Sequence, residues 1–427
     1  MKQPRALRWL RLDNAAKIYP AARRKHWSNL FRQSVTLTEA VDREILSRAL
    51  NVTVPRFPGI AARLRRGMFW YYLQELAHGP ELSEECSYPL RCMSREEVRR
   101  CAFRVIVYRE RIAVEFFHAL TDGNGALVFL KTLTAEYLEQ KYGITIPAEA
   151  GVLDRREPPR EEELEDSFLR YAGPVSARRG GRKAWQPRGT ALPGGALRLC
   201  CFRLPLEESL ALARRYGVTL TVLLSAALMQ ALLRLQAETA PRRAGCRPVK
   251  LLIPVNLRQL FPSSTLRNFV LYTIPELDPR LGDYSFEEIC SIIRHKMGLE
   301  VRAKHMSRMI ATNVGNERST LLRLVPLPLK DLVMKAVFER VGERQACLSL
   351  SNLGAVTLPE AMRPYIRRFD FILGAQAAAP HNCAVLSWDD TVYVNFTRNI
   401  REPELERQFW LVLRELGLPA TAESNED

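Results

Sequence analysis

One continuous stretch, residues 101–142, constrains the fold more than any other part of this chain. It begins with "CAFRVIVYRERIAVEFF", in which two short arms flank the polar turn Arg109-Glu110-Arg111. Large apolar side chains take every second position of both arms, at Phe103, Val105, Val107, Ile112, Val114 and Phe116. A period of two on either side of a turn is typical of a β-hairpin that buries one face. We therefore expect an antiparallel pair of strands here.

The loop after this hairpin, "FFHALTDGNG", carries one of only six histidines in the chain. His118 continues the apolar parity of the second arm, so its side chain is expected to point inward just where the strand ends. Beyond Gly125, apolar residues recur at helical spacing, at Leu127, Leu130, Leu133 and Tyr137. The stretch is thus predicted to join a buried strand to an amphipathic helix, a place where loops present functional groups.

Strand and helix patterns are mixed throughout the rest of the chain, which predicts an α/β (α+β) fold. With 427 residues, 47% of them hydrophobic, the chain can bury one large core or two. From about residue 153 to 195 the periodicity disappears, because "EPPREEELED" is acidic and "SARRGGRKAWQPRG" is basic and glycine-rich. We therefore divide the chain into an N-terminal lobe at 1–152, a crossover or linker at 153–195 and a C-terminal lobe at 196–427.

Two helices are predicted near the ends of the chain. Thr36 and Glu39 stand at capping-box spacing, which predicts that the first helix begins at Thr36. The last helix, "PELERQFWLVLREL", has Pro403 in its first turn, where proline is tolerated. It is expected to bury one apolar stripe, made of Leu405, Phe409, Val412 and Leu416.

The charge balance favours anionic partners. Lysine and arginine outnumber aspartate and glutamate by 63 to 47, a net charge of +16. Phosphorylated cofactors, an acidic acyl carrier protein and peripheral contact with a lipid surface all fit this excess, and so does a solvated arginine-rich surface with no partner. We expect no nucleic-acid partner, because the sequence has no zinc finger, no RNP-type aromatic motif and no basic helix with base-reading residues.

The apolar segments and the cysteines indicate the cellular compartment of the protein and whether it binds a structural metal. The first residues contain no apolar stretch of signal-peptide length, and the most apolar helix, "VTLTVLLSAALMQALLRL", is interrupted by Ser225 and Gln230. The nine cysteines include no C-x-x-C pair, so they are interpreted as reduced thiols of a cytoplasmic protein. No two histidines or cysteines fall at the spacing of a structural zinc site, and we expect no metal.

His118 has two interpretations from the residues alone. It is either a neutral core histidine, hydrogen-bonded to backbone beside an Asp-Gly turn, or the reactive group of a site. A carboxylate, Asp122, follows it at the fourth position, and Gly123 comes next, a residue that lets backbone pass close by. These neighbours, placed between a strand and a helix, favour a site.

The motif "HALTDG" resembles the H-x-x-x-D-G signature of the CoA-dependent acyltransferase superfamily, which includes chloramphenicol acetyltransferase, polyketide-associated acyltransferases and peptide-synthetase condensation domains. The long crossover, "IPVNLR", "SNLG" and a terminal strand-strand-helix extend the resemblance over nearly the whole chain, and it looks closest to the bacterial alcohol acetyltransferase-like branch. It implies a two-lobed chloramphenicol acetyltransferase-like fold, each lobe a mixed sheet with flanking helices. Many members have two consecutive histidines, and Phe117 replaces the first here, which weakens an assignment to condensation domains.

The resemblance also implies roles for individual residues. His118 would be the catalytic general base, without an acyl-enzyme, since an imidazole with a pKa near 6.5 is mostly neutral at cellular pH. Asp122 would point away from His118 into an ion pair that shapes the loop, and we expect Arg258 as its partner, although an exposed loop arginine is an equal interpretation. Asn352 is a candidate substrate or oxyanion neighbour, or simply a turn-forming residue. No oxyanion donor is identified.

The function implied is an acyl-CoA-dependent O-acyltransferase. It would move an acetyl or longer acyl group from acyl-CoA, for example acetyl-CoA, to a hydroxyl-bearing, hydrophobic acceptor. Two alternatives stay open. One is a condensation-type enzyme that takes its acyl group from a carrier protein, and the other is a catalytically inactive binding protein of the same fold.

Overall fold

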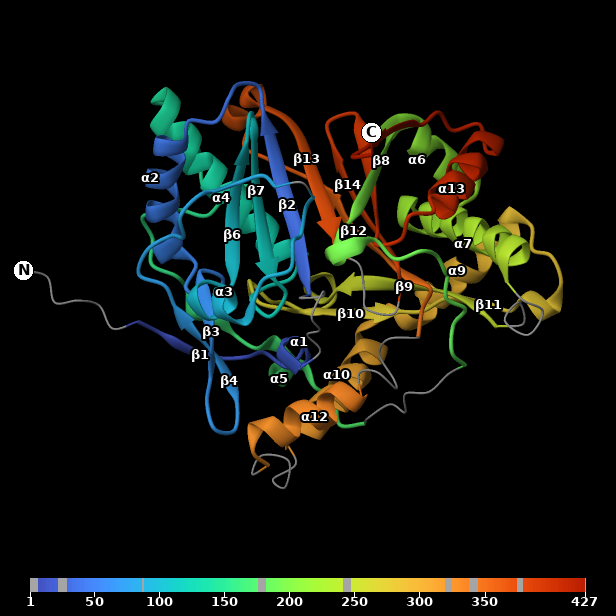
Figure 1. Ribbon diagram of the computed structural model, residues 1–427, viewed down its shortest axis with the longest axis horizontal. Helices are drawn as coiled ribbons and strands as arrows, with labels where there is room; N and C mark the ends of the chain where they lie inside the picture. Colours follow the sequence, from blue (N-terminus) through green and yellow to red (C-terminus); the bar gives the residue numbers. More distant parts are fainter. Residues whose placement is uncertain are drawn as a thin grey trace, which may run out of the picture.

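A computed structural model describes residues 7–21, 29–86, 88–175, 182–240, 247–318, 325–337, 345–374 and 379–426 (Figure 1). Its first sheet has five strands in the order β13-β2-β7-β6-β5 and is mixed, because β5 joins it in parallel. The strands are β2 (Leu30–Leu37), β5 (Ser83–Glu84), β6 (Phe103–Tyr108), β7 (Arg111–Phe117) and β13 (Ile366–Leu373). Helices α2 (Arg43–Thr53) and α4 (Gly123–Tyr142) pack on each other beside this sheet (Figure 1).

The predicted hairpin is confirmed. β6 and β7 pair antiparallel with Phe103 opposite Phe116, and the turn residue Arg109 takes a left-handed φ of 50°. The alternation, however, does not leave one face in water, because β7 lies between β2 and β6 and is buried on both sides. On the second face Glu115 is buried in ion pairs with Arg32 and Arg104. The alternating pattern would place these charged side chains in water, but in the structure they are buried and form ion pairs with one another.

The predicted helix start at Thr36 is wrong. Thr36 still belongs to β2, where it pairs with Arg111 of β7 and with Arg368 of β13. Helix α2 begins only after Asp42, whose carboxylate accepts hydrogen bonds from the next free backbone amides, Glu44 and Ile45. Sheet pairing on both sides of β2 thus prevails over a local capping-box pattern.

The second sheet has eight strands and is also mixed, with β12 parallel to β9 and β14. Its order is β10-β9-β12-β14-β15-β8-β16, with β11 on β9. The strands are β8 (Arg198–Pro205), β9 (Val249–Asn256), β10 (Val270–Thr273), β11 (Glu276–Leu277), β12 (Leu348–Ala355), β14 (His381–Trp388), β15 (Thr391–Arg398) and β16 (Thr421–Ser424). The helices beside it are α6 (Leu206–Arg215), α7 (Leu220–Thr239), α9 (Phe286–Glu300) and α13 (Glu404–Glu415) (Figure 1).

Two of these helices bear on the sequence predictions. Helix α7 has the length and hydropathy of a membrane span, but most of it is buried in the second core against α9 and α13. Helix α13 is confirmed, with Pro403 at its N-cap position, and it buries Leu405, Phe409 and Val412, while Leu416 is half-buried at the C-terminal end. Both helices therefore contribute side chains to the hydrophobic core that packs against the second sheet.

Smaller elements make up the rest of the described structure. An antiparallel sheet of β1 (Trp9–Arg11), β4 (Tyr71–Glu75) and β3 (Ala62–Arg66) lies beside the first lobe. The other helices of the described residues are α1 (Ile18–Ala21), α3 (Arg95–Arg100), α5 (Ser167–Tyr171), α10 (Ala303–Arg318) and α12 (Leu327–Val337). Short 3₁₀ helices are η1 (Val54–Arg56), η2 (Glu161–Leu164), η3 (Pro193–Gly195), η4 (Leu257–Gln259), η5 (Pro279–Leu281) and η7 (Glu360–Tyr365).

The α/β class with mixed sheets and flanking helices is confirmed, and two features tie the predicted lobes together. Strand β13 lies late in the sequence, yet it pairs with β2 of the first sheet. In the crossover, Glu163 forms a buried ion pair with Arg56, and Trp185 enters the second core. The limits 1–152 and 196–427 stay a prediction, and β13 crosses them.

Candidate active site around His118

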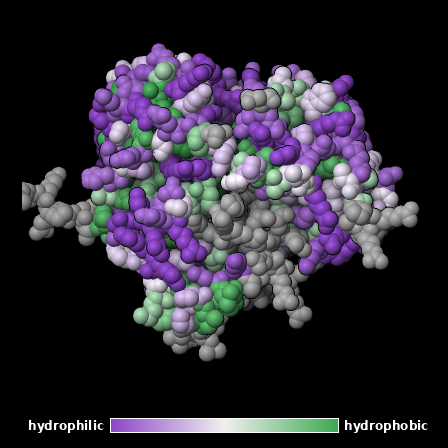
Figure 2. Space-filling view, viewed as in Figure 1, coloured by the Kyte–Doolittle hydropathy of each residue, from purple (hydrophilic) through white to green (hydrophobic). Residues whose placement is uncertain are grey.

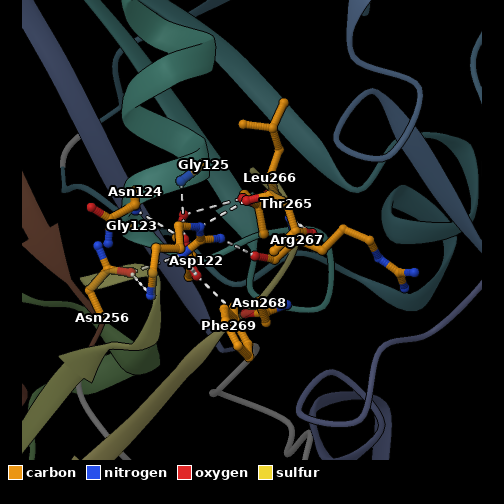
Figure 3. A network of polar contacts seen from close by, with 12 residues as sticks. Asp122, Gly123, Asn124, Gly125, Asn256, Thr265, Leu266, Arg267, Asn268 and Phe269 are labelled. Carbon is orange, nitrogen blue, oxygen red and sulfur yellow. Dashed lines mark hydrogen bonds and ion pairs between the residues drawn. The ribbon is translucent and has the colours of Figure 1, made fainter. Parts of the chain in front are cut away.

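Asp122 holds the loop after β7 in place from inside the molecule (Figure 3). It is the N-cap of α4, and its Oδ1 accepts hydrogen bonds from the amides of Asn124 at 3.1 Å and Gly125 at 3.0 Å. Its Oδ2 accepts from the amide of Phe269 at 2.9 Å. Asp122 therefore caps the start of α4 and also joins it to the segment around Phe269, which is far away in the sequence.

Arg258 is the ionic partner of Asp122, as predicted. Its Nη1 lies 2.7 Å from Asp122 Oδ2, and the two side chains are 15% and 2% exposed. Its other nitrogens donate to the carbonyl oxygens of Thr265 at 2.8 Å and Arg267 at 2.6 Å. The alternative of an exposed loop arginine is therefore wrong. The guanidinium shapes the segment that precedes β10 and joins it to the His118 loop.

The glycines of the loop are required by close packing. A Cβ atom at Gly125 would lie 2.2 Å from the carbonyl oxygen of Leu266 and 2.2 Å from Thr121 Oγ1. At Gly123, the glycine of the motif, a Cβ would meet Leu353 Cδ2 at 2.8 Å. The sequence identified Gly123, but the tighter backbone contact is at Gly125.

His118 itself is held by Asn268, which the sequence analysis missed. The Nδ2 amide of Asn268 donates to the carbonyl oxygen of His118 at 3.1 Å and to Asp13 Oδ2 at 3.2 Å. The carbonyl oxygen of His118 can only accept, so Nδ2 must face it and the amide oxygen Oδ1 must face the imidazole, where it lies 3.1 Å from Nδ1. The orientation of Asn268 is thus fixed by its own donors.

This orientation sets the tautomer of His118. An amide oxygen cannot donate a hydrogen bond, so Nδ1 of the imidazole must carry the proton. In a neutral ring Nε2 is then the unprotonated nitrogen, and among the described residues the side-chain hydrogen bond of this ring is the one at Nδ1. Within the described part of the chain, His118 therefore offers one free lone pair, at Nε2, which is the atom that a general base needs.

The surroundings keep the ring neutral. Tyr19 of α1 stacks on His118 with ring centroids 4.6 Å apart, and Phe31 of β2 lies at 4.9 Å. Burial lowers the pKa of His118 below its ordinary value, although its own carbonyl, Asp122 and Asn268 oppose the shift. Burial and nearby carboxylates raise the pKa of Tyr19. At neutral pH the imidazole is therefore uncharged and able to accept a proton.

Asp13 anchors Asn268 from behind. It is fully buried, and its Oδ1 accepts a hydrogen bond from the amide of Ala16 at 2.7 Å. Burial raises its pKa, while the Arg267 guanidinium, with Nε 3.7 Å from Oδ2, opposes the rise. The chain Asp13–Asn268–His118 runs from the N-terminal segment through the second half of the protein to the loop after β7.

Asn352 makes its hydrogen bonds away from His118. Its Nδ2 donates to Thr221 Oγ1 at 3.0 Å, and its Oδ1 accepts from the amide of Gly354 at 2.8 Å. These contacts join the end of β12 to the start of α7. The neighbouring Leu353 is the residue that reaches the loop, against Gly123. A role of Asn352 toward substrate stays a prediction.

Comparisons with known proteins extend these observations. No family model matches the chain, and no curated protein matches it in sequence. Among solved structures, TRI3 trichothecene 15-O-acetyltransferase from Fusarium sporotrichioides has a TM-score of 0.61 at 13% identity, covering 96% of this chain and 94% of its own. Polyketide synthase associated protein 5 from Mycobacterium tuberculosis has a TM-score of 0.60 at 15% identity, covering 95% and 97%.

A third neighbour, F. sporotrichioides TRI101, was solved in complex with coenzyme A and T-2 and has a TM-score of 0.60 at 12% identity, covering 98% of this chain and 100% of its own. The fold is that of these two-lobed acyltransferases. Condensation domains share it, among them the first condensation domain of the CDA synthetase, with a TM-score of 0.58 at 14% identity over 97% and 96% of the two chains. At such identities the likeness concerns the fold alone, and the chemistry depends on the residues of the site.

Proposed function

We propose that this protein is an acyl-CoA-dependent O-acyltransferase in which His118 is the general base. The observation that carries the proposal is the tautomer fixed by Asn268, which leaves Nε2 unprotonated on a ring that burial keeps neutral. Asn268 pairs Nδ1, as burial requires of any polar atom, and Nε2 keeps the unprotonated lone pair that a general base needs.

The chemistry needs no covalent enzyme intermediate. Nε2 of His118 takes the proton of an acceptor hydroxyl as the oxygen attacks the thioester carbonyl carbon of the donor. The tetrahedral intermediate collapses, the carbon–sulfur bond breaks, and the imidazolium returns its proton to the departing thiolate. The cation formed in this cycle is stabilised by the Asn268 amide oxygen and by the carboxylates Asp122 and Asp13, which raise the pKa of the ring against its burial.

Asp122 and Arg258 serve the site as positioning residues. Their ion pair ties the start of α4 to the segment before β10, the segment that carries Asn268. Because Asn268 fixes the imidazole, a change in that segment would misplace the base without touching it. The proposal assigns the reacting group to His118 alone.

The acyl donor is proposed to be acyl-CoA, and the acceptor a hydrophobic alcohol. The net charge of +16 supports a phosphorylated donor, and the rings of Tyr19 and Phe31 beside His118 support an apolar acceptor. A donor held on an acyl carrier protein is the alternative, because carrier-dependent condensation domains share the fold. A second alternative is a catalytically inactive binding protein of the same fold.

One assay separates the three. Free thiol is measured after mixing the protein with acetyl-CoA or longer acyl-CoAs and a panel of primary, secondary and aromatic alcohols, with acyl carrier donors in parallel. Release that needs both an acyl-CoA and an alcohol supports the proposal, and release only with the carrier donor supports the alternative. Binding of CoA by calorimetry with no release from any donor would identify a binding protein.

A further inference from the structure

Six large apolar side chains are exposed together at one edge of the molecule. Three follow β3 in the β3–β4 turn and three lie on α12: Met68, Phe69, Trp70, Leu329, Leu332 and Val333. We call this set the α12 face. Figure 2 shows hydrophobic side chains gathered at the lower edge of the view, where Figure 1 places α12 and the β3–β4 hairpin. Exposed apolar patches of this kind mark interaction surfaces.

Specific contacts hold the two halves of the α12 face against each other. The amide of Leu327 donates to the carbonyl oxygen of Met68 at 3.0 Å, and Lys330 Nζ donates to the carbonyl oxygen of Phe69 at 3.1 Å. The Tyr71 hydroxyl donates to Asp331 Oδ2 at 2.7 Å. The hairpin tip and the helix therefore form one continuous surface.

The apolar stripe of α12 points away from the protein. Leu329, Leu332 and Val333 follow the i, i+3, i+4 spacing of one helix face, and each is more than half exposed. The polar residues Lys330 and Asp331 instead face the hairpin. A helix that only had to pack on its own domain would bury the apolar stripe, so this arrangement suits an external apolar phase.

The rim of the α12 face is basic. Lys17 and Lys330 both lie over the ring of Trp70, with Nζ 5.7 Å and 3.5 Å from its centroid. Partial burial and the neighbouring Lys17 lower the pKa of Lys330. Arg66 and Lys335 are exposed at the ends of β3 and α12, and Asp331, the one acidic residue in these segments, is hydrogen-bonded by Tyr71.

We propose that the α12 face docks on the surface of an anionic phospholipid bilayer. Apolar side chains that project beyond a ring of lysine and arginine, with an aromatic residue among them, fit the boundary between acyl chains and negative headgroups. A second copy of this chain fits less well, because an isologous contact would bring the same cations of two copies together. The net charge of +16 favours the same partner.

Docking at this face would bring the bilayer to the candidate active site. Helix α1 packs on α12, and α1 carries Tyr19, the residue that stacks on His118. If the proposed function holds, the acceptor would then be a membrane-dissolved alcohol that reaches His118 from the lipid side. The docking itself rests on the surface alone and does not depend on catalysis.

Vesicle flotation tests the docking. The full chain is mixed with phosphatidylcholine vesicles with or without phosphatidylglycerol, and the bound fraction is measured at low and high salt. We expect binding that requires phosphatidylglycerol and weakens with salt. Leu332→Glu should weaken it by about tenfold or more, because it replaces an inserted apolar side chain with a charge.

Leu299→Glu is the matched control, since Leu299 on α9 is 67% exposed and Leu332 is 65% exposed. It should change binding by less than about twofold. His118→Ala should bind vesicles like wild type, so a failed acyltransferase assay leaves the docking result intact. Equal losses in the two leucine variants, or no lipid binding by wild type, would overturn the proposal. So would a wild-type dimer that Leu332→Glu converts to a monomer while vesicles fail to bind.

Discussion

His118 lies in the turn after β7 of the first sheet, whereas His381 lies in β14 of the second, and burial lowers the pKa of both imidazoles. His118 is only partly buried, and its Nδ1 has an acceptor whose orientation is fixed by two further hydrogen bonds. His381 is 1% exposed, and neither of its ring nitrogens has a hydrogen-bond partner among the described residues. Its nearest carboxylate oxygen, Glu406 Oε2, is 3.8 Å from Nε2.

The comparison separates two properties that are easily confused. Low dielectric surroundings disfavour the charged imidazole wherever it is buried, so a lowered pKa by itself marks no site. What distinguishes His118 is a frame of donors and acceptors that assigns the proton to one nitrogen and leaves the other free. If this frame, and not burial, makes the difference, substitutions at the two histidines should have different effects on activity.

The largest expected effect is on turnover. His118→Ala removes the base and should lower kcat by about 10²–10⁴-fold, with KM for the acyl-CoA nearly unchanged. His381→Ala removes an imidazole that is more fully buried than His118 and should leave kcat per folded molecule within about twofold. Thiol release and thermal melting are measured on the same preparations. Comparable losses of kcat in both folded variants would mean that burial alone explains His118.

The next effect concerns the ion pair that frames the His118 loop. Asp122→Asn leaves the buried Arg258 guanidinium without its counter-charge, and we expect a loss of about 3–5 kcal/mol in the free energy of unfolding. Asp389→Asn is the control, because its pair with Arg363 is exposed, and it should cost at most about 1 kcal/mol. Urea unfolding measures both. Similar small losses would remove the structural role of Asp122.

A pH effect on stability is expected from His381. The unfolded chain takes up this proton near the ordinary pKa of about 6.5, whereas burial and the Arg398 guanidinium lower the pKa of folded His381 to about 3. The unfolded state therefore binds more protons between these values, and stability falls as the pH drops through that window. His381→Leu should reduce the slope by up to about 1.4 kcal/mol per pH unit, as measured by urea unfolding from pH 7 to 4. An unchanged slope would contradict a neutral buried His381.

The smallest effect is expected at Asn268. Asn268→Ala removes one hydrogen bond to the imidazole and should lower kcat by about 3- to 10-fold with little change in KM. Because that bond raises the pKa of His118, its loss should also move the acid limb of the kcat profile to lower pH. Asn352→Ala, whose bonds go to Thr221 and Gly354, should leave this limb in place. Equal shifts in both variants would remove the positioning role of Asn268.

The sequence predicted what local pattern determines. The alternation of apolar residues predicted the β6–β7 hairpin. The change from strand spacing to helix spacing predicted that His118 and Asp122 lie in the loop after β7. Arg258 was identified as the partner of Asp122 through a family resemblance, and the ion pair is present. The hairpin and the His118 loop depended on residues close together in the chain, whereas Arg258 lies 136 residues from Asp122 and was identified only through the resemblance.

The sequence did not predict what long-range packing determines. Asn268 lies 150 residues from His118, and Asp13 lies in an N-terminal segment with no periodic pattern, so neither had a local signal. The pairing of β13 with β2 was missed for the same reason, because many apolar strands could fill that edge. The false helix start at Thr36 arose because a capping box is a local signal that sheet pairing can override.

The protonation state of His118 tests the central claim most directly, and it requires no substrate. Histidine labelled with ¹⁵N is incorporated into the full chain, and the His118 resonances are assigned by their loss in His118→Gln. At pH 7 the structure predicts a pyrrole-type Nδ1 that carries the proton and a pyridine-type Nε2 that does not. A proton on Nε2, or a fully protonated ring at that pH, would contradict the assignment of His118 as the base.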